Sequence, residues 1–330
     1  MIISKTPFRI SFFGGGTDLP EYFTSNKGAV ISTTINKYIY HTVSEHPKEI
    51  NSSSIKIVYS KVENTSKISD LKHRPFREIL KLMGIKNNIE VHVISDLPSF
   101  SGLGGSSSFT VGLIKVLTEY KKMTISKKNL ALKAIDIERN ILKESVGMQD
   151  QTAASFGGLN LIEFNNLNNV IVKPIKINQF FLKKLNNSLM LFFTGIKRRA
   201  QDIEEKKIKN IDNISRNLDE IYITTYKALN ILEIEQDIYK FGKLLNDTWN
   251  LKRQLDKSVS NKIVDQMYQK AIQAGAIGGK LLGAGGGGFM LFVAPQKKKK
   301  DIKMALKNFY EVDFDIFSEG SKIIQGNIKT

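Results

Sequence analysis

Three glycines and three serines stand close together between residues 102 and 108, and these residue types suit the binding of a phosphate. An alternating apolar segment at residues 89–94 predicts a strand before them, and residues 109–117 show helical spacing after them. Glycines allow a ligand to approach the backbone, and a helix N-terminus offers free N–H groups to an anion. The stretch therefore predicts a phosphate-binding loop, with a glycine turn and a serine N-cap as the ordinary alternative. Its members are Gly102, Leu103, Gly104, Gly105, Ser106, Ser107 and Ser108.

Three carboxylates are candidates for work on a phosphoryl group or on the hydroxyl that attacks it: Asp18, Glu138 and Asp150. Each has an ordinary alternative, as a turn residue, an exposed helical carboxylate and a helix N-cap, respectively. Arg9 lies within a predicted strand, where a partly buried cation needs an anionic partner. The four histidines show no metal-ligand spacing.

Two further glycine-rich loops occur at residues 14–16 and 283–288. No G-x-x-x-x-G-K-[ST] sequence is present, which excludes a P-loop, and the protein-kinase H-R-D and D-F-G elements are missing. Residues 283–288 satisfy G-x-G-x-x-G, but a predicted strand follows them rather than a helix, so a dinucleotide-binding fold is excluded. Three such loops indicate a site that holds a phosphorylated or anionic ligand through its backbone.

The elements that must position these loops mix strands and helices. We expect strands at residues 2–13, 55–59, 89–94, 159–164, 170–174, 189–193, 289–293 and 312–317, and a pair of strands within 29–43 that breaks near Asn36-Lys37. We expect helices at residues 75–83, 109–117, 127–144, 262–274 and 298–310, and a mainly helical segment at 200–255. Residues 148–158 form a loop or a helix start. This order predicts the α+β class, with a boundary near residues 175–190.

Composition narrows the class of protein. The chain has 330 residues, which favours two domains, and it has no cysteine, which excludes disulfides and zinc–thiolate sites. No apolar run reaches about 18 residues, and no signal peptide is recognisable, so we expect a cytoplasmic protein without membrane spans. The net charge of +17 raises nucleic-acid binding as an alternative, but the lysines are scattered and lack interleaved aromatic residues.

Together the loops resemble the motifs of the GHMP kinases, small-molecule kinases that include galactokinase, homoserine kinase and mevalonate kinase. Residues 7–18, 97–108 and 280–289 resemble the three family motifs in the family's order, and residues 147–151 resemble the galactokinase stretch with the catalytic aspartate. The resemblance implies an α+β fold of two domains. These are a domain like ribosomal-protein S5 domain 2 over residues 1–180 and a ferredoxin-like domain over residues 181–330.

The resemblance also implies ATP and Mg²⁺ as cofactors and a role for each candidate residue. Asp150 would orient or deprotonate the attacking hydroxyl, with Arg9 beside it. Ser106 and Glu138 would bind Mg²⁺, with Glu144 as the next carboxylate, and residues 102–108 would enclose the triphosphate. The residues implied for binding the sugar are Gly16, Thr17, Asp18, Asp150, Gly285 and Gly286.

The sequence departs from the family pattern at two places. Gly105 stands where the first serine after Gly-Leu-Gly is expected, and Gly15-Gly16 stands where galactokinases carry Glu-His, so a sugar other than galactose is implied. The motifs imply a heptose 7-phosphate, phosphorylated at its anomeric hydroxyl to a 1,7-bisphosphate for nucleotide-activated heptose in surface polysaccharide. A fucokinase-like activity is the alternative.

Lys197, Arg198 and Arg199 follow a predicted strand end and are candidates for binding the phosphate that the sugar already carries, with a basic turn as the ordinary alternative. The expected partners are thus a sugar phosphate and ATP, without nucleic acid or membrane, and a homodimer is left open. Two other functions compete with this one: nucleic-acid binding, and sensing of sugar and ATP without turnover.

Overall fold

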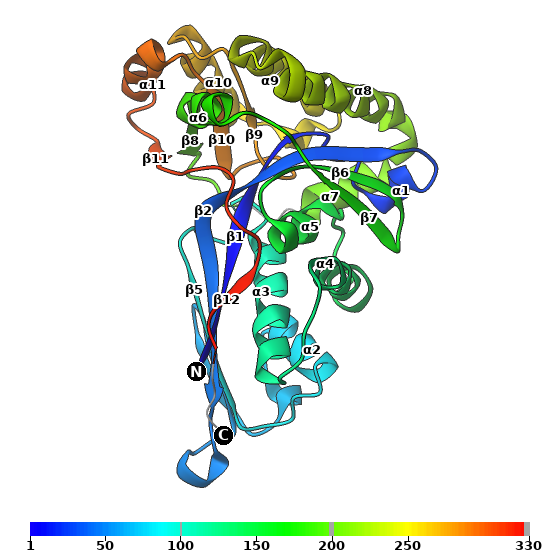
Figure 1. Cartoon of the computed structure of the whole chain (residues 1–330), viewed down its shortest axis with the longest axis vertical. Helices are drawn as coiled ribbons and strands as arrows, with labels where there is room; N and C mark the ends of the chain where they lie inside the picture. Colours follow the sequence, from blue (N-terminus) through cyan, green and yellow to red (C-terminus); the bar gives the residue numbers. More distant parts are fainter. Residues whose placement is uncertain (100, 198–200, 327–330) are drawn as a thin grey trace.

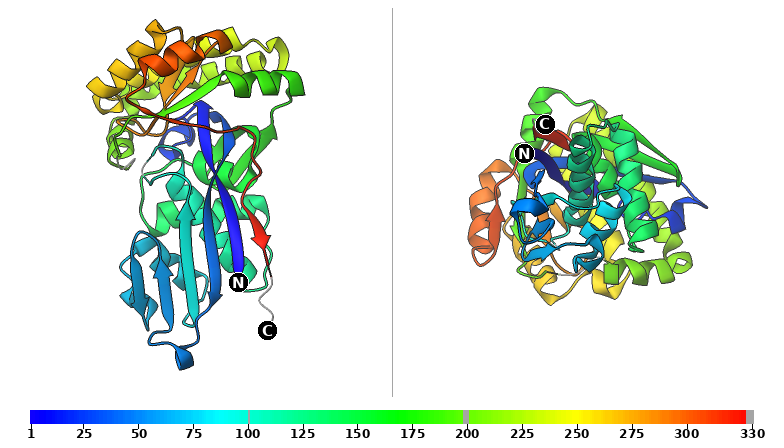
Figure 2. Two further views of the ribbon diagram at one scale, coloured as in Figure 1. Left: turned by 90° about the vertical axis from the view of Figure 1, so that its left-hand side faces the viewer. Right: turned by 90° about the horizontal axis from the view of Figure 1, so that it is seen from below.

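The computed structural model describes residues 1–99, 101–197 and 201–326. Two antiparallel-rich sheets organise the described chain, one in each half (Figures 1 and 2). The larger sheet has the order β12-β1-β2-β5-β3-β4, and β6 and β7 extend it from β2. Its strands are β1 (Ile2–Phe13), β2 (Gly28–Glu45), β3 (Ile55–Val58), β4 (Val62–Thr65), β5 (Ile89–Ser95), β6 (Leu159–Asn166), β7 (Asn169–Pro174) and β12 (Lys322–Gln325).

Strand β2 is continuous over 18 residues, so the expected pair of strands is wrong. The first part of β2 pairs with β6 and its second part pairs with β5. Its register against β1 shifts between Pro7 and Arg9, opposite the segment where we expected a break. A bulge of this kind bends a strand without ending it, and here it lets one strand serve two partners.

Helix α3 (Gly105–Tyr120) packs along β1 and β2, and Figure 1 shows α2, α3 and α4 on one side of this sheet. Ten of its residues are buried, because sheet and helices enclose it. The other helices of this half are α1 (Pro20–Phe23), α2 (Arg74–Leu82), α4 (Lys127–Asp136), which continues into a π-helical turn at Ile137–Ile141, and α5 (Gln149–Phe156). Short 3-10 turns lie at Lys48–Ile50 and Ile68–Asp70.

The second sheet has the order β11-β8-β10-β9 and carries helices around it. Its strands are β8 (Leu189–Phe193), β9 (Gly278–Leu281), β10 (Phe289–Val293) and β11 (Tyr310–Val312). The helices are α6 (Gln179–Ser188), α7 (Gln201–Lys209), α8 (Ile211–Asn230), α9 (Ile238–Arg253), α10 (Lys262–Gln273) and α11 (Lys299–Ala305), with a π-helical turn at Ile231–Glu235 and 3-10 turns at Lys257–Val259 and Gln296–Lys298. We had not expected α6 or β9, and β9 lacks the β-branched residues that mark strands.

The end of the chain returns to the first sheet. Strand β12 pairs antiparallel with β1, with Lys322 opposite Lys5, and Figure 2 shows the two strands side by side near the termini. The closing strand expected at residues 312–317 is instead the short β11. The division predicted after residue 180 falls within the first turn of α6, and β12, far beyond it in the sequence, belongs to the first sheet.

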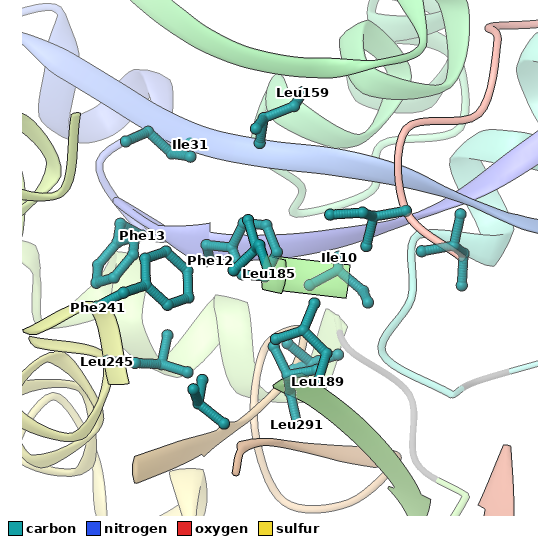
Figure 3. Close-up of a cluster of buried hydrophobic side chains, with 14 of the residues drawn as sticks. Ile10, Phe12, Phe13, Ile31, Leu159, Leu185, Leu189, Phe241, Leu245 and Leu291 are labelled. Carbon is teal, nitrogen blue, oxygen red and sulfur yellow. The ribbon is translucent and has the colours of Figure 1, made fainter. Parts of the chain in front are cut away.

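The end of β1 packs against α9 and joins the two halves through one apolar cluster (Figure 3). The Phe241 ring meets Phe12 and Phe13 edge to face, with ring centroids 5.3 and 5.4 Å apart. Leu185, Leu189 and Leu291 from the second half belong to the same cluster. Because β1 also carries Arg9, this packing fixes the C-terminal half relative to the candidate catalytic residues. Within the described residues, no helix has the length and apolarity to cross a membrane.

We expect Phe241→Ala to lower the free energy of unfolding by about 3–5 kcal/mol, because it leaves a cavity where three rings meet. Urea denaturation measures the change. Tyr239→Ala is the matched control, since Tyr239 lies on the same helix and is 58% exposed. A loss no larger than that of the control would show that the ring cluster does not hold the halves together.

Candidate active site

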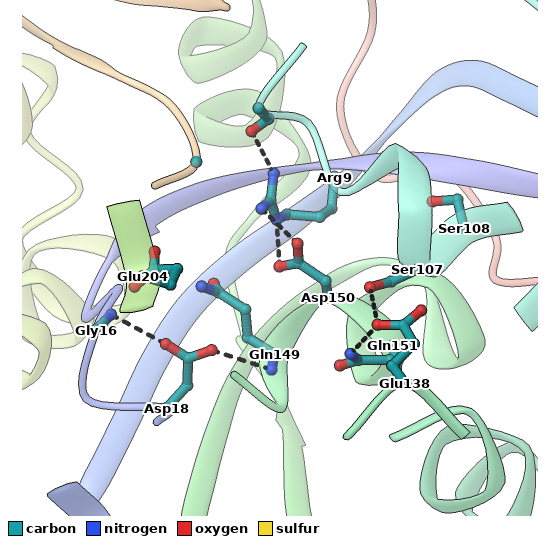
Figure 4. A network of polar contacts seen from close by, with 12 residues as sticks. Arg9, Gly16, Asp18, Ser107, Ser108, Glu138, Gln149, Asp150, Gln151 and Glu204 are labelled. Carbon is teal, nitrogen blue, oxygen red and sulfur yellow. Dashed lines mark hydrogen bonds and ion pairs between the residues drawn. The ribbon is translucent and has the colours of Figure 1, made fainter. Parts of the chain in front are cut away.

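An ion pair between Arg9 of β1 and Asp150 of α5 lies at the centre of the site (Figure 4). Nε and Nη2 of Arg9 donate to Oδ1 and Oδ2 of Asp150 at 2.8 and 2.7 Å. Nη1 of Arg9 donates to the carbonyl oxygen of Gly102 at 2.8 Å. The Arg9 side chain is 4% exposed and that of Asp150 is 25% exposed. The anionic partner expected for Arg9 is therefore Asp150, and the carboxylate remains open to a substrate.

The glycine–serine loop meets this pair at the start of α3. Gly102 and Gly104 have φ values of +79° and +75°, and Gly104 is the N-cap of α3, without a side-chain hydrogen bond. A Cβ atom on Gly104 would lie 3.1 Å from Cγ of Arg9 and 3.3 Å from Oδ2 of Asp150. Glycine is thus needed here for close approach, and the alternative of a serine N-cap is wrong. The helix N-terminus points its free amides beside the ion pair.

The three serines have different surroundings. Ser106 is exposed, the Ser107 hydroxyl donates to Oε2 of Glu138 at 2.9 Å, and the Ser108 hydroxyl donates to the Pro7 carbonyl oxygen at 2.8 Å. The serine that contacts Glu138 is therefore Ser107. The serine expected to share an ion with Glu138 is Ser106, one position earlier in the helix.

Glu138 lies in the π-helical turn after α4 and is fully buried. Its Oε2 also accepts a hydrogen bond from Nε2 of Gln151 at 2.6 Å, whereas its Oε1 has no partner among the described residues. Burial, followed by repulsion from Glu144, raises the pKa of Glu138 to about 7. A buried carboxylate oxygen without a partner is costly and needs a donor or a cation.

The oxygen atoms around Glu138 fit Mg²⁺, which prefers hard oxygen ligands and keeps several waters. Glu138 offers its unpartnered Oε1, and the hydroxyl of Ser107 lies beside it. Ser106, in the first turn of α3, is close in sequence and exposed. The assignment of the ion to Ser106 and Glu138 stays a prediction, and Ser107 joins them as a candidate.

The first glycine loop is held together by Thr17 and Asp18. The buried Thr17 hydroxyl donates to the carbonyl oxygens of Gly14 and Ala29 at 2.8 and 2.9 Å. Oδ1 and Oδ2 of Asp18 accept hydrogen bonds from the amides of Gly16 and Gln149 at 2.9 and 3.3 Å. Burial and the neighbouring Asp150 raise the pKa of Asp18 to about 6. These contacts shape the loop, and sugar binding by Gly16, Thr17 and Asp18 stays a prediction.

The third glycine loop packs directly on the glycine–serine loop at residues 102–108. A Cβ atom on Gly283 would lie 2.6 Å from Cα of Gly102. Gly285 has a φ of +129°, and the amide of Gly286 donates to the carbonyl oxygen of Val259 at 2.8 Å. The amide of Gly286 is therefore engaged within the protein, while that of Gly285 makes no hydrogen bond among the described residues.

Sequence reasoning missed two polar side chains beside the ion pair. Oε1 of Gln149 and Oε2 of Glu204 are buried and have no partner within the described chain, and Figure 4 shows Gln149 between Asp18 and Asp150 and Glu204 near Gly16. Gln149 could have been found, because it directly precedes Asp150. Glu204 gave no signal beyond an acidic helix start. Arg198 and Arg199, expected at a second phosphate, lie outside the described residues, and Lys197 is exposed.

Comparison with known proteins gives consistent matches. The family models described as GHMP kinases N terminal domain and GHMP kinases C terminal match residues 72–158 and 227–312. The chain is 34% identical to the D-glycero-alpha-D-manno-heptose 7-phosphate kinase of Campylobacter jejuni, over 97% of this chain and 98% of that protein. It is 24% identical to a bifunctional fucokinase/GDP-fucose pyrophosphorylase of Arabidopsis thaliana, over 95% of this chain and 32% of that protein.

A solved structure described as a D-glycero-D-manno-heptose 1-phosphate kinase from Bacteroides thetaiotaomicron has the same fold. It superposes with a TM-score of 0.80 at 26% identity, covering 98% of this chain and 99% of that one.

We expect Glu138→Gln to stabilise the ligand-free protein increasingly as the pH rises. The folded-state pKa of Glu138 is about 7, and the unfolded one is 4.5. The wild type therefore loses stability as the pH rises from 4.5 to about 7, because the unfolded chain releases a proton that the folded protein keeps. From pH 5 to pH 8, the free energy of unfolding of the variant should improve by about 2–3 kcal/mol relative to wild type. Urea denaturation at both pH values measures this, and an equal difference at both would contradict it.

Proposed function

Because this chain belongs to the GHMP kinases, we propose that it transfers the γ-phosphoryl group of ATP to the anomeric hydroxyl of D-glycero-D-manno-heptose 7-phosphate. The chain is an ATP-dependent sugar kinase, and the sugar and the position of transfer are the proposal. The product would be the 1,7-bisphosphate, for nucleotide-activated heptose in surface polysaccharide. The name of the Campylobacter jejuni relative and the motifs of residues 7–18 and 102–108 support this choice.

The observation that carries the proposal is the Arg9–Asp150 pair beside the first turn of α3. Arg9 holds both carboxylate oxygens of Asp150, which fixes the direction of the side chain. A carboxylate fixed in this way can orient a sugar hydroxyl or accept its proton as the hydroxyl attacks. Phosphoryl transfer depends mainly on alignment and charge stabilisation, so this geometry is sufficient chemically.

The first turn of α3 supplies the donors for the phosphates. The first described bond of this helix runs from the Ser108 amide to the Gly104 carbonyl oxygen, so the amides of Gly105, Ser106 and Ser107 are free. Free amides at the positive end of a helix bind phosphate oxygens. Mg²⁺ bound by Glu138 and a serine of this turn would neutralise charge on those oxygens.

Three alternatives predict different outcomes. A fucokinase-like sugar 1-kinase would use the same residues on another sugar, and the relative from Arabidopsis thaliana motivates it. Nucleic-acid binding would leave the Arg9–Asp150 pair and the buried Glu138 without a role. A sensor that binds sugar and ATP without turnover would consume no ATP.

Asp150→Asn should lower kcat by roughly 10²–10⁴-fold and leave ATP binding nearly unchanged, because it removes the charge that aligns the hydroxyl. A coupled assay of ATP consumption with heptose 7-phosphate, L-fucose, galactose and mevalonate measures both the preferred sugar and the loss. Calorimetry with a non-hydrolysable ATP analogue is the control for nucleotide binding. Near wild-type turnover would remove Asp150 from the mechanism, and no turnover of the wild type on any heptose phosphate would refute the proposed substrate.

A second set of variants decides which serine binds the ion. Glu138→Gln should raise the Mg²⁺ concentration for half-maximal rate, because it removes a hard oxygen ligand. Ser107→Ala should do the same if the hydroxyl beside Glu138 is a ligand, and Ser106→Ala if the motif alignment is correct. Titration of activity with MgCl₂ compares the three, and an unchanged titration for Glu138→Gln would transfer the role to Glu144.

A further inference from the structure

Three lysines are buried together in the C-terminal half, although lysine is rarely buried in proteins. Lys207 of α7, Lys252 of α9 and Lys280 of β9 are 3%, 6% and 3% exposed. They come from separate elements, and none was a candidate site residue in the sequence, although Lys280 begins the third family motif at residues 280–289. Their common position suggests a shared role.

The ammonium groups bind backbone carbonyl oxygens around the third glycine loop. Nζ of Lys207 donates to the carbonyl oxygen of Ala284 at 2.8 Å. Nζ of Lys252 donates to those of Leu281, at 3.1 Å, and Gly283. Lys280 reaches across to the first half, where it donates to the carbonyl oxygen of Phe12 at 2.8 Å.

The positive charge of these lysines is not balanced. Within the described chain, Glu204, 3.2 Å from Lys207, is the carboxylate in contact with them, and Asp150 is paired with the neighbouring Arg9. Lys252 and Lys280 contact only neutral oxygens. Buried charge without a partner is strongly unfavourable. A phosphate monoester, with a charge of about −1.5 to −2 at pH 7, would match the excess.

The pKa shifts of Lys280 and Lys252 are those expected where positive charges repel one another and an anion would bind. Burial, then repulsion from Arg9 and Lys207, lowers the pKa of Lys280 to about 7. Burial and repulsion from Lys280 lower the pKa of Lys252 well below its usual range. An anion would relieve this repulsion.

Peptide geometry supplies the donors for such an anion. In a trans peptide the C=O and N–H bonds point in opposite directions. Since Lys252 and Lys207 hold the carbonyl oxygens of Gly283 and Ala284, the amides of Ala284 and Gly285 point away from the lysines, and neither donates a bond among the described residues. Positive φ values at Gly283 and Gly285 suit the concave loops of amides that bind anions. The ammonium groups also polarise these peptides, which strengthens their N–H donors.

We propose that the glycine loop at residues 283–288 is a second phosphate subsite beside the phosphate-binding loop. Lys207, Lys252 and Lys280 supply its positive charge. Contact between Gly283 and Gly102 places both loops in one site. The occupant is a phosphoryl group, and we assign it to the phosphate that the substrate sugar already carries. This last assignment rests on the proposed function, whereas the binding of phosphate does not.

Phosphate binding tests the subsite directly. Inorganic phosphate is titrated by calorimetry into the full chain saturated with Mg²⁺ and a non-hydrolysable ATP analogue, which occupies the phosphate-binding loop. Lys252→Met should weaken phosphate binding roughly ten- to hundredfold, because it removes a positive charge close to the loop, and Lys252→Arg should restore part of it. The control is Lys243→Met, at an exposed position of the same helix. Lys207→Met gives the same test if Lys252→Met does not fold, as judged by circular dichroism. Undetectable binding by wild type, or equal affinity of wild type and the Lys→Met variants, would overturn the subsite.

Kinetics identify the source of the phosphate. If the sugar supplies it, Lys252→Met should raise the KM for heptose 7-phosphate roughly tenfold or more and leave the KM for ATP and for unphosphorylated heptose nearly unchanged. A rise confined to ATP would overturn the assignment to the sugar. An equal fall in kcat on both sugars, without a change in KM, would show that the lysines only hold the loop in place. If no heptose is a substrate, the proposed function fails, and the phosphate titration still decides the subsite.

Discussion

The site depends on one partly buried ion pair, between the guanidinium of Arg9 and the carboxylate of Asp150. Arg9 uses its side chain to bind Asp150 and the Gly102 carbonyl oxygen, and its amide donates to the carbonyl oxygen of Leu103 at 3.1 Å. One residue of β1 thereby fixes both the catalytic candidate on α5 and the path of the glycine–serine loop at residues 102–108. The directional, bidentate bonds of arginine allow this, and lysine could not reproduce them.

Other charged groups near the ion pair are buried at a cost in free energy, and ligands of opposite charge would reduce that cost. Among the described residues, Glu138 is buried with one oxygen unpartnered, and Lys252 and Lys280 are buried without a carboxylate in contact. Carboxylate pKa values are raised at Asp18 and Glu138, and ammonium pKa values are lowered at Lys252 and Lys280. Such opposed shifts cluster where ligands and catalysis need them. Stability is thus reduced at the positions where a cation and an anion would bind.

The two halves of the chain are joined so that these charges face one site. The rings of Phe12 and Phe13 pack on Phe241, a few residues along β1 from Arg9. Lys280 crosses the same junction to the Phe12 carbonyl oxygen, and β12 ties the end of the chain back to β1. The geometry of the glycine loop at residues 283–288 relative to Asp150 therefore rests on β1, which contributes to both halves of the core.

The sequence by itself determined the local features: the glycines at chain turns, a helix following the glycine–serine stretch, the need of Arg9 for an anion and, through resemblance to a family, the two-domain α+β fold. Only the tertiary structure decided that Ser107 rather than Ser106 contacts Glu138, that β2 continues through Asn36-Lys37, and that three lysines meet behind one loop. The physical reason is the range of the interactions. A glycine turn or a helix start depends on neighbouring residues, whereas Lys280 and Phe12 are 268 positions apart, and no local pattern records such a contact.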